Sequence, residues 1–127
     1  MVLVDTSIWI RFLTAKEPFA TELDQLLAEG EVLAHDLVYG ELFMRERGGR
    51  AKLLAAYAEM HRAPSVAHEE VVELVKSRRL GGRAIGWIGA QLLASALVVG
   101  SRLWTADAAL KDIAEDLAID HRPTRNG

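Results

Sequence analysis

Three acidic residues of this 127-residue chain stand where a fold could bring their carboxylates together. Asp5 directly follows the apolar run Val2–Val4, and Asp107 follows the strand-like segment 102–105. Glu41 is spaced so that a helix would turn it toward the same side as its apolar neighbours. Because sites in open parallel sheets usually lie outside the carboxyl ends of the strands, we expect Asp5 and Asp107 to share a cleft, to which Glu41 adds a carboxylate.

Grouped carboxylates have a chemical consequence. They repel one another and gain protons unless a cation compensates them, and ligand sets made only of oxygen suit hard ions such as Mg²⁺ or Mn²⁺. Such ions can activate a water, orient a phosphodiester and stabilise the attacking and leaving oxygens of a displacement. The grouping therefore predicts hydrolysis of phosphodiester bonds.

The same residues also have simpler interpretations. Asp5 and Asp107 each fit the N-cap of a helix, and Glu41 could pair with Arg45 one turn later. Another interpretation makes Asp5 the nucleophile of a phosphatase or phospho-acceptor fold, but that pattern requires a second aspartate two residues later, where this chain has Ser7. Spacing alone leaves these interpretations open.

Strand-like runs that alternate with helical spacing indicate how these residues would be positioned. The runs 2–4, 32–34 and 102–105 are typical of buried strands, and apolar residues at helical spacing follow each of them. Asp36 is expected to be the N-cap of the helix after the second run. This alternation predicts an α/β fold with three layers, in which helices flank a short parallel sheet.

Composition limits the remaining function classes. The length suits one domain, expected over residues 1–121 and followed by a loose tail at 122–127. The formal charge of −3 argues against a general positive field for nucleic acid. The chain has no cysteine and no visible secretory signal, which favours the cytoplasm, and the uncharged stretch 84–100 is too short for a membrane span.

Four segments stand in an order and spacing that resemble a known family. They cover nearly the whole chain, and they are Asp5 to Ile10, Val38 to Leu42, Ile85 to Ala96, and Leu103 to Asp107. These segments resemble the motifs of PIN domains, and more narrowly those of VapC toxins. The resemblance implies the three-layer α/β/α PIN fold over almost the full length.

The resemblance also implies a function. VapC toxins are metal-dependent endoribonucleases of type II toxin–antitoxin systems, and Asp5, Glu41 and Asp107 match their catalytic, metal-binding acids. The expected ion is Mg²⁺, with Mn²⁺ as a substitute, and the expected attacking group is a metal-activated water. The expected partners are an RNA substrate, a cognate antitoxin that blocks the cleft, and a second copy of the chain in a homodimer or a toxin–antitoxin hetero-oligomer.

Residues next to the motifs are expected to support the site. Hydroxyl groups that could orient a ligand or its water, or simply cap helices and strand ends, belong to Thr6, Ser7 and Thr105. Basic residues that lead into the third motif and could bind RNA phosphates, or form a solvated face, are Arg78, Arg79 and Arg83. His35 could act as a general base, but a polar residue at a strand end is the favoured interpretation.

Gly89 is a departure from the family pattern. The family has an aspartate at this position, at the start of the long helix, and that acid belongs to the metal-binding set. Its absence implies lower metal affinity and turnover, whether the glycine is natural or introduced. Two hypotheses follow: a weakened endoribonuclease, or a catalytically impaired PIN domain that binds antitoxin and RNA without cleavage.

Overall fold

A computed structural model of the chain describes residues 1–123. In chain order the elements are β1 (Val2–Val4), α1 (Thr6–Leu13), α2 (Phe19–Ala28), β2 (Val32–Leu33), α3 (Asp36–Met44), α4 (Ala51–Ala58), α5 (His68–Ser77), α6 (Trp87–Val99), β3 (Arg102–Trp104) and α7 (Ala108–Asp116). Positions 124–127, which belong to the predicted tail, lie outside the described residues.

β1 is the central strand of a parallel sheet with the order β2-β1-β3. Val2 and Leu3 pair with β2, and the whole of β1 pairs with β3. Every residue of β1 is buried, as a continuous apolar run predicts for a strand covered on both faces. The predicted parallel sheet is confirmed, and the carboxyl ends of its strands lie at one edge.

Two further segments cover the outer edges of the sheet. Beside β2, the Ala34 N–H donates to the His61 carbonyl at 2.7 Å, and the Ala63 N–H donates to the Ala34 carbonyl at 2.8 Å. Segment 119–121 pairs in the same way with Leu103 in β3. These contacts satisfy backbone groups that an open sheet edge would leave unpaired.

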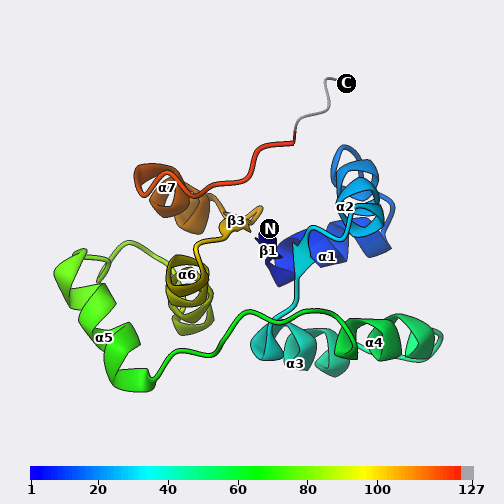
Figure 1. Cartoon of the computed structure of the whole chain (residues 1–127), viewed down its shortest axis with the longest axis horizontal. Helices are drawn as coiled ribbons and strands as arrows, with labels where there is room; N and C mark the ends of the chain where they lie inside the picture. Colours follow the sequence, from blue (N-terminus) through cyan, green and yellow to red (C-terminus); the bar gives the residue numbers. More distant parts are fainter. Residues whose placement is uncertain (124–127) are drawn as a thin grey trace.

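Helices lie on both sides of the sheet (Figure 1). In that view α6 and α3 lie below the strands and α2 lies above them. Leu92 and Leu93 of α6 are completely buried, and the helix ends at Gly100, whose φ of 70° is a left-handed conformation that glycine adopts at little cost. This arrangement confirms the predicted α/β fold.

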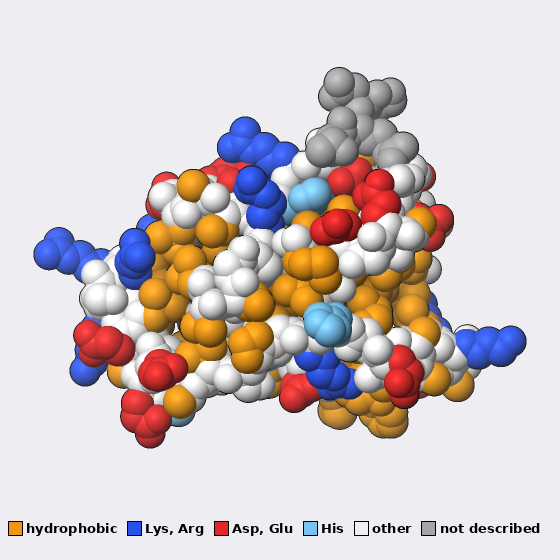
Figure 2. All heavy atoms as spheres, in the orientation of Figure 1, with side chains coloured by type: hydrophobic (Ala, Val, Ile, Leu, Met, Phe, Trp, Pro, Cys, Tyr) orange, Lys and Arg blue, Asp and Glu red, His pale blue; other side chains and the backbone are white. Residues whose placement is uncertain are grey.

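Charge is distributed around the molecule rather than concentrated. On the face shown in Figure 2, hydrophobic side chains occupy the middle, and the Lys and Arg side chains stand apart near the margin. On this face they do not merge into a continuous basic surface, in agreement with the formal charge of −3. Within residues 1–123 no helix has the length and apolar character needed to cross a membrane.

Candidate active site

The Asp5 carboxylate lies at the end of the central strand and accepts several hydrogen bonds. Asp5 is the N-cap of α1, and its Oδ1 accepts from the Thr6 N–H at 2.8 Å. Its Oδ2 accepts from the Ser7 hydroxyl and from the Thr105 hydroxyl, both at 2.7 Å. Donors from α1 and from the end of β3 therefore fix the orientation of this carboxylate.

Glu41 is joined to the same helix start through Thr6. The Thr6 hydroxyl donates to Glu41 Oε1 at 2.6 Å, and Thr6 is only 5% exposed. No ion pair joins Glu41 to Arg45 within the described residues, so the interpretation in which Arg45 neutralises Glu41 is wrong for this structure. The inward orientation expected for Glu41 agrees with its contact to Thr6.

Asp107 lies at the end of the neighbouring strand and caps α7. Its Oδ1 accepts from the Ala109 N–H at 3.0 Å, as an N-cap side chain does. The Asp107 N–H donates to the Thr105 hydroxyl at 3.0 Å, while that hydroxyl donates to Asp5. One hydroxyl thus connects the two strand ends that carry Asp5 and Asp107. Capping and membership of one acidic site are compatible roles for both aspartates.

The donor chemistry of this edge fits a hard divalent ion, but the set is incomplete. Carboxylate oxygens are the ligands that Mg²⁺ and Mn²⁺ prefer. Among residues 1–123, however, no three Asp, Glu, His or Cys side chains approach closely enough to hold a metal ion. Thr6 bonds to both Asp5 and Glu41, and the Thr105 hydroxyl joins the Asp5 carboxylate to the backbone N–H of Asp107, so these contacts do not involve the Asp107 carboxylate.

Gly89 lies in the first turn of α6, at the position where the sequence departs from the expected pattern. A Cβ built there would lie 3.5 Å from a methyl of Leu110 and 3.9 Å from the Ile85 Cβ, which are ordinary van der Waals distances. The position therefore has room for a side chain. Because Leu110 belongs to α7, that side chain would begin on the side of α6 that faces the helix capped by Asp107.

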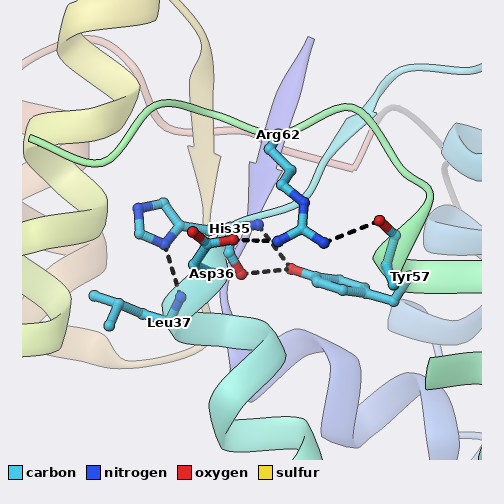
Figure 3. A network of polar contacts seen from close by, with 6 residues as sticks. His35, Asp36, Leu37, Tyr57 and Arg62 are labelled. Atoms are coloured by element: carbon cyan, nitrogen blue, oxygen red, sulfur yellow. Dashed lines mark hydrogen bonds and ion pairs between the residues drawn. The ribbon is translucent and has the colours of Figure 1, made fainter. Parts of the chain in front are cut away.

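His35 is a structural residue in the core. It is completely buried, and its Nδ1 accepts from the Leu37 N–H at 3.0 Å (Figure 3). Its Nε2 lies 2.9 Å from the Ser95 hydroxyl. Burial lowers the pKa of His35 despite the opposing charge of Asp36. His35, and not Asp36, is the N-cap of α3, so the N-cap predicted from the sequence is wrong by one residue.

Of the arginines proposed for RNA binding, Arg83 is paired at the end of α7 that lies opposite Asp107. Arg78 and Arg79 are exposed after α5. Arg83 Nη2 lies 3.3 Å from Asp116 Oδ2, at the last residue of α7. Asp107 caps the opposite end of this helix, and a helix of nine residues is about 13 Å long. The structure therefore does not bring Arg83 next to Asp107, and the RNA contact of Arg78 and Arg79 stays a prediction.

Two cations beside the acids escaped the sequence analysis. Arg11 directly follows the first motif, and its Nη1 donates to the carbonyl of Ser7, one helical turn earlier, at 2.9 Å. Lys111 follows Asp107 by one turn of α7, and its backbone N–H donates to the Asp107 carbonyl at 2.9 Å. Each cation lies within the first two turns of a helix that an aspartate caps, and this position was the signal available in the sequence.

Comparisons with known proteins agree with the geometry. The sequence model of the PIN domain matches residues 2–116. The chain is 45% identical over 112 residues to Ribonuclease VapC32 of Mycobacterium tuberculosis strain CDC 1551 / Oshkosh, which covers 87% of this chain and 88% of that protein. Ribonuclease VapC32 of strain ATCC 25618 / H37Rv shows the same identity and coverage. The chain therefore belongs to the PIN-domain family and, within it, to the VapC group.

Proposed function

We propose that this chain is the toxin of a type II toxin–antitoxin system and an endoribonuclease that depends on a divalent metal ion. One observation carries the proposal: three donors hold the Asp5 carboxylate at the end of the central strand, Thr6 also donates to Glu41, and the Thr105 hydroxyl that holds Asp5 accepts from the Asp107 backbone N–H. Two relatives at 45% identity bear the name ribonuclease. The three carboxylates would hold Mg²⁺ or Mn²⁺.

The residues of the chain contribute orientation and charge. The chemistry that a bound Mg²⁺ would supply is activation of a water and neutralisation of charge on the phosphodiester. Ser7 and Thr105 hold Asp5 Oδ2 in place, and Thr6 holds Glu41 Oε1. Residues that hold ligating carboxylates in this way typically affect metal affinity or activity by about 10- to 100-fold.

Cleavage of total bacterial RNA by the purified chain tests the proposal. We expect slow cleavage with Mg²⁺ or Mn²⁺ and none with chelator. Asp5→Asn is the matched blank, because asparagine also caps helices well, removes the charge and replaces one acceptor oxygen by an NH2 group. Cleavage that persists in chelator, or that is equal in Asp5→Asn, contradicts this function.

A second candidate is a PIN domain that binds without cleaving. Gly89 favours it, because this position lacks the expected acid, and so does the absence of a three-residue metal-binding group within residues 1–123. In that case the chain would bind RNA and antitoxin, but neither Mg²⁺ nor Mn²⁺ would support cleavage. A mobility shift of intact RNA, with no product after long incubation in either ion, supports this candidate over the first.

The antitoxin would cover an apolar surface beside Glu41. Phe43 and Met44 in α3 are 58% and 86% exposed, and Trp87 and Ile88 at the start of α6 are 41% and 37% exposed. Glu41, Met44 and Ile88 share an open hollow of about 570 Å³. Exposed apolar patches next to a polar site are typical of partner surfaces. An antitoxin segment bound there would lie over the acidic site.

A further inference from the structure

A small pocket shares a wall with the acidic site. It has a volume of about 330 Å³ and lies between α1, the start of α2, the end of β3 and α7. Thr105, which donates to Asp5, is one of its lining residues, and Ala106 is the next. A group bound in this pocket would therefore contact the residue that holds the Asp5 carboxylate, and the pocket is separate from the apolar hollow beside Glu41, because the two have no lining residue in common.

Aromatic rings form one wall of the pocket. The Phe19 ring stacks on the Trp104 ring with centroids 6.3 Å apart. The Arg11 guanidinium lies over the Phe19 ring at 5.3 Å from its centroid and also donates to the Ser7 carbonyl at 2.9 Å. Trp104 is only 3% exposed, so Phe19 and the planar Arg11 guanidinium are the surfaces on which an unpaired RNA base could stack.

Two positive charges at the pocket are not compensated. Among the described residues no carboxylate forms an ion pair with Arg11 or with Lys111, and both line the pocket. Arg122 also lines it, but its charge is satisfied by Asp120 at 2.7 Å and Glu115 at 3.4 Å. Arg11 and Lys111 are therefore the cations free to bind a phosphate.

We propose that this pocket binds one nucleotide of the RNA strand next to the bond that is cleaved, with its phosphate on Arg11 and Lys111 and its base against Phe19. The inference rests on the proposed function, because it names the part of the RNA that the same site recognises. A volume of about 330 Å³ lies at the small end of ligand pockets, which suits one nucleotide. Contacts to backbone phosphates position an RNA strand, and bases of any sequence can stack on an aromatic ring.

The cations of the pocket are connected to the acidic residues more directly than Arg83 is. Arg11 is connected to Asp5 through one residue, Ser7, whose carbonyl accepts from Arg11 and whose hydroxyl donates to Asp5. Lys111 lies one turn from Asp107. By contrast, Arg83 is paired with Asp116 at the far end of α7.

Titration of the full chain with adenosine 5′-monophosphate, followed by amide and indole NMR signals, tests the pocket without any need for cleavage. We expect shifts at Arg11, Phe19, Trp104 and Lys111, and an affinity at least about tenfold higher than for adenosine or inorganic phosphate. Shifts confined to other surfaces, or equal affinity for the three compounds, overturn the proposal. NMR is preferred to tryptophan fluorescence because the chain has three tryptophans.

Binding of a short single-stranded RNA in chelator gives the second test. Arg11→Gln/Lys111→Gln is expected to weaken binding about tenfold and to reduce the salt slope by about 0.7 for each phosphate lost. Arg78→Gln/Arg79→Gln removes the same charge elsewhere and should leave both quantities nearly unchanged. If the two double variants lose RNA affinity equally, the proposed role of the pocket is wrong.

The two tests separate failure of the pocket from failure of the proposed function. If the unmodified chain cleaves RNA and Arg11→Gln/Lys111→Gln binds RNA normally, the pocket is wrong and the nuclease proposal stands. If no variant cleaves RNA but adenosine 5′-monophosphate still shifts the pocket signals, the pocket stands and the nuclease proposal fails.

Discussion

Thr105 connects the acidic residues more directly than any motif indicated. Its hydroxyl donates to Asp5 and accepts from the Asp107 N–H, and the side chain is 5% exposed. Sequence spacing identified Asp5 and Asp107 as strand-end acids. It left capping and metal binding as alternatives, whereas the structure shows both aspartates capping helices at one edge. The contact between Thr6 and Glu41 spans 35 positions, and no local pattern encodes such a contact.

Thr105→Val tests the importance of that hydroxyl. The substitution keeps the shape but leaves the Asp107 N–H and one Asp5 oxygen without this partner, so we expect the free energy of unfolding to fall by about 1–3 kcal/mol. Any RNA cleavage should fall by about 10- to 100-fold. Urea denaturation and initial cleavage rates provide the measurements. Thr105→Ser, which keeps the hydroxyl, should lose much less, and equal losses in the two variants would show that shape rather than the hydroxyl matters.

Gly89→Ala tests whether the glycine is needed by the fold. Gly89 has no left-handed φ, and its Cβ position makes only ordinary contacts. Alanine should therefore raise the free energy of unfolding by about 0.5–1 kcal/mol, because glycine in a helix costs conformational entropy. Chemical denaturation measures this change. A clear loss of stability would mean that Leu110 cannot accommodate the methyl group.

At the scale of elements, the sequence predicted strands and helices well because they follow simple hydrophobic periods. The runs 2–4 and 32–34 are buried strands or strand ends, and the helix that ends at Gly100 is present as expected. The strand order β2-β1-β3 and the edge segments near Ala63 and Asp120 were not predicted. Each edge segment pairs through a single bridge, which is too short to produce a period.

His35, the N-cap of α3, is expected to make the stability of the fold depend on pH. Burial lowers its pKa below the ordinary value of 6.5, so the unfolded chain takes up a proton at higher pH than the folded chain does. The contribution of His35 to stability is therefore complete above pH 6.5 and is lost as the pH falls from 6.5 toward the lowered pKa of the folded state. Urea denaturation between pH 7 and 5 should show His35→Gln with a weaker pH dependence than the unmodified chain.

His61→Gln is the control for this pH dependence, because His61 is exposed. It should keep the pH dependence of the unmodified chain. If His35→Gln keeps the full dependence and His61→Gln loses it, the buried ring is not the group responsible.

For the whole molecule, the net charge agrees with the distribution of cations, whereas the RNA contact expected from the arginine cluster stays a prediction. The sequence excluded a general basic field, and Figure 2 shows scattered cations on one face. It favoured Arg78, Arg79 and Arg83 for RNA because they precede the third motif in the chain. Proximity in sequence is not proximity in space here, since Arg83 pairs with Asp116 while Arg11 and Lys111 line the pocket beside Thr105.

Met44→Asp tests the partner surface at this scale. Met44 is 86% exposed, so a charge there should change the free energy of unfolding by no more than about 0.5 kcal/mol. A charge in an apolar interface should weaken binding of the cognate antitoxin by at least about tenfold. Calorimetric titration of the antitoxin into each variant measures the effect. Val98→Asp, on the exposed end of α6, is the control, and equal weakening by both variants contradicts the proposed surface.

The most direct test of the central claim is the rate of metal-dependent RNA cleavage by Gly89→Asp beside Gly89→Asn and the unmodified chain. Asp and Asn have nearly the same shape, so only the negative charge at this position distinguishes them. We predict that Gly89→Asp cleaves at least about tenfold faster with Mg²⁺ or Mn²⁺ than the other two proteins, and not at all with chelator. Equal rates for Gly89→Asp and Gly89→Asn, or no cleavage by any of the three, would contradict the assignment of Asp5, Glu41 and Asp107 as an acidic nuclease site that lacks one carboxylate.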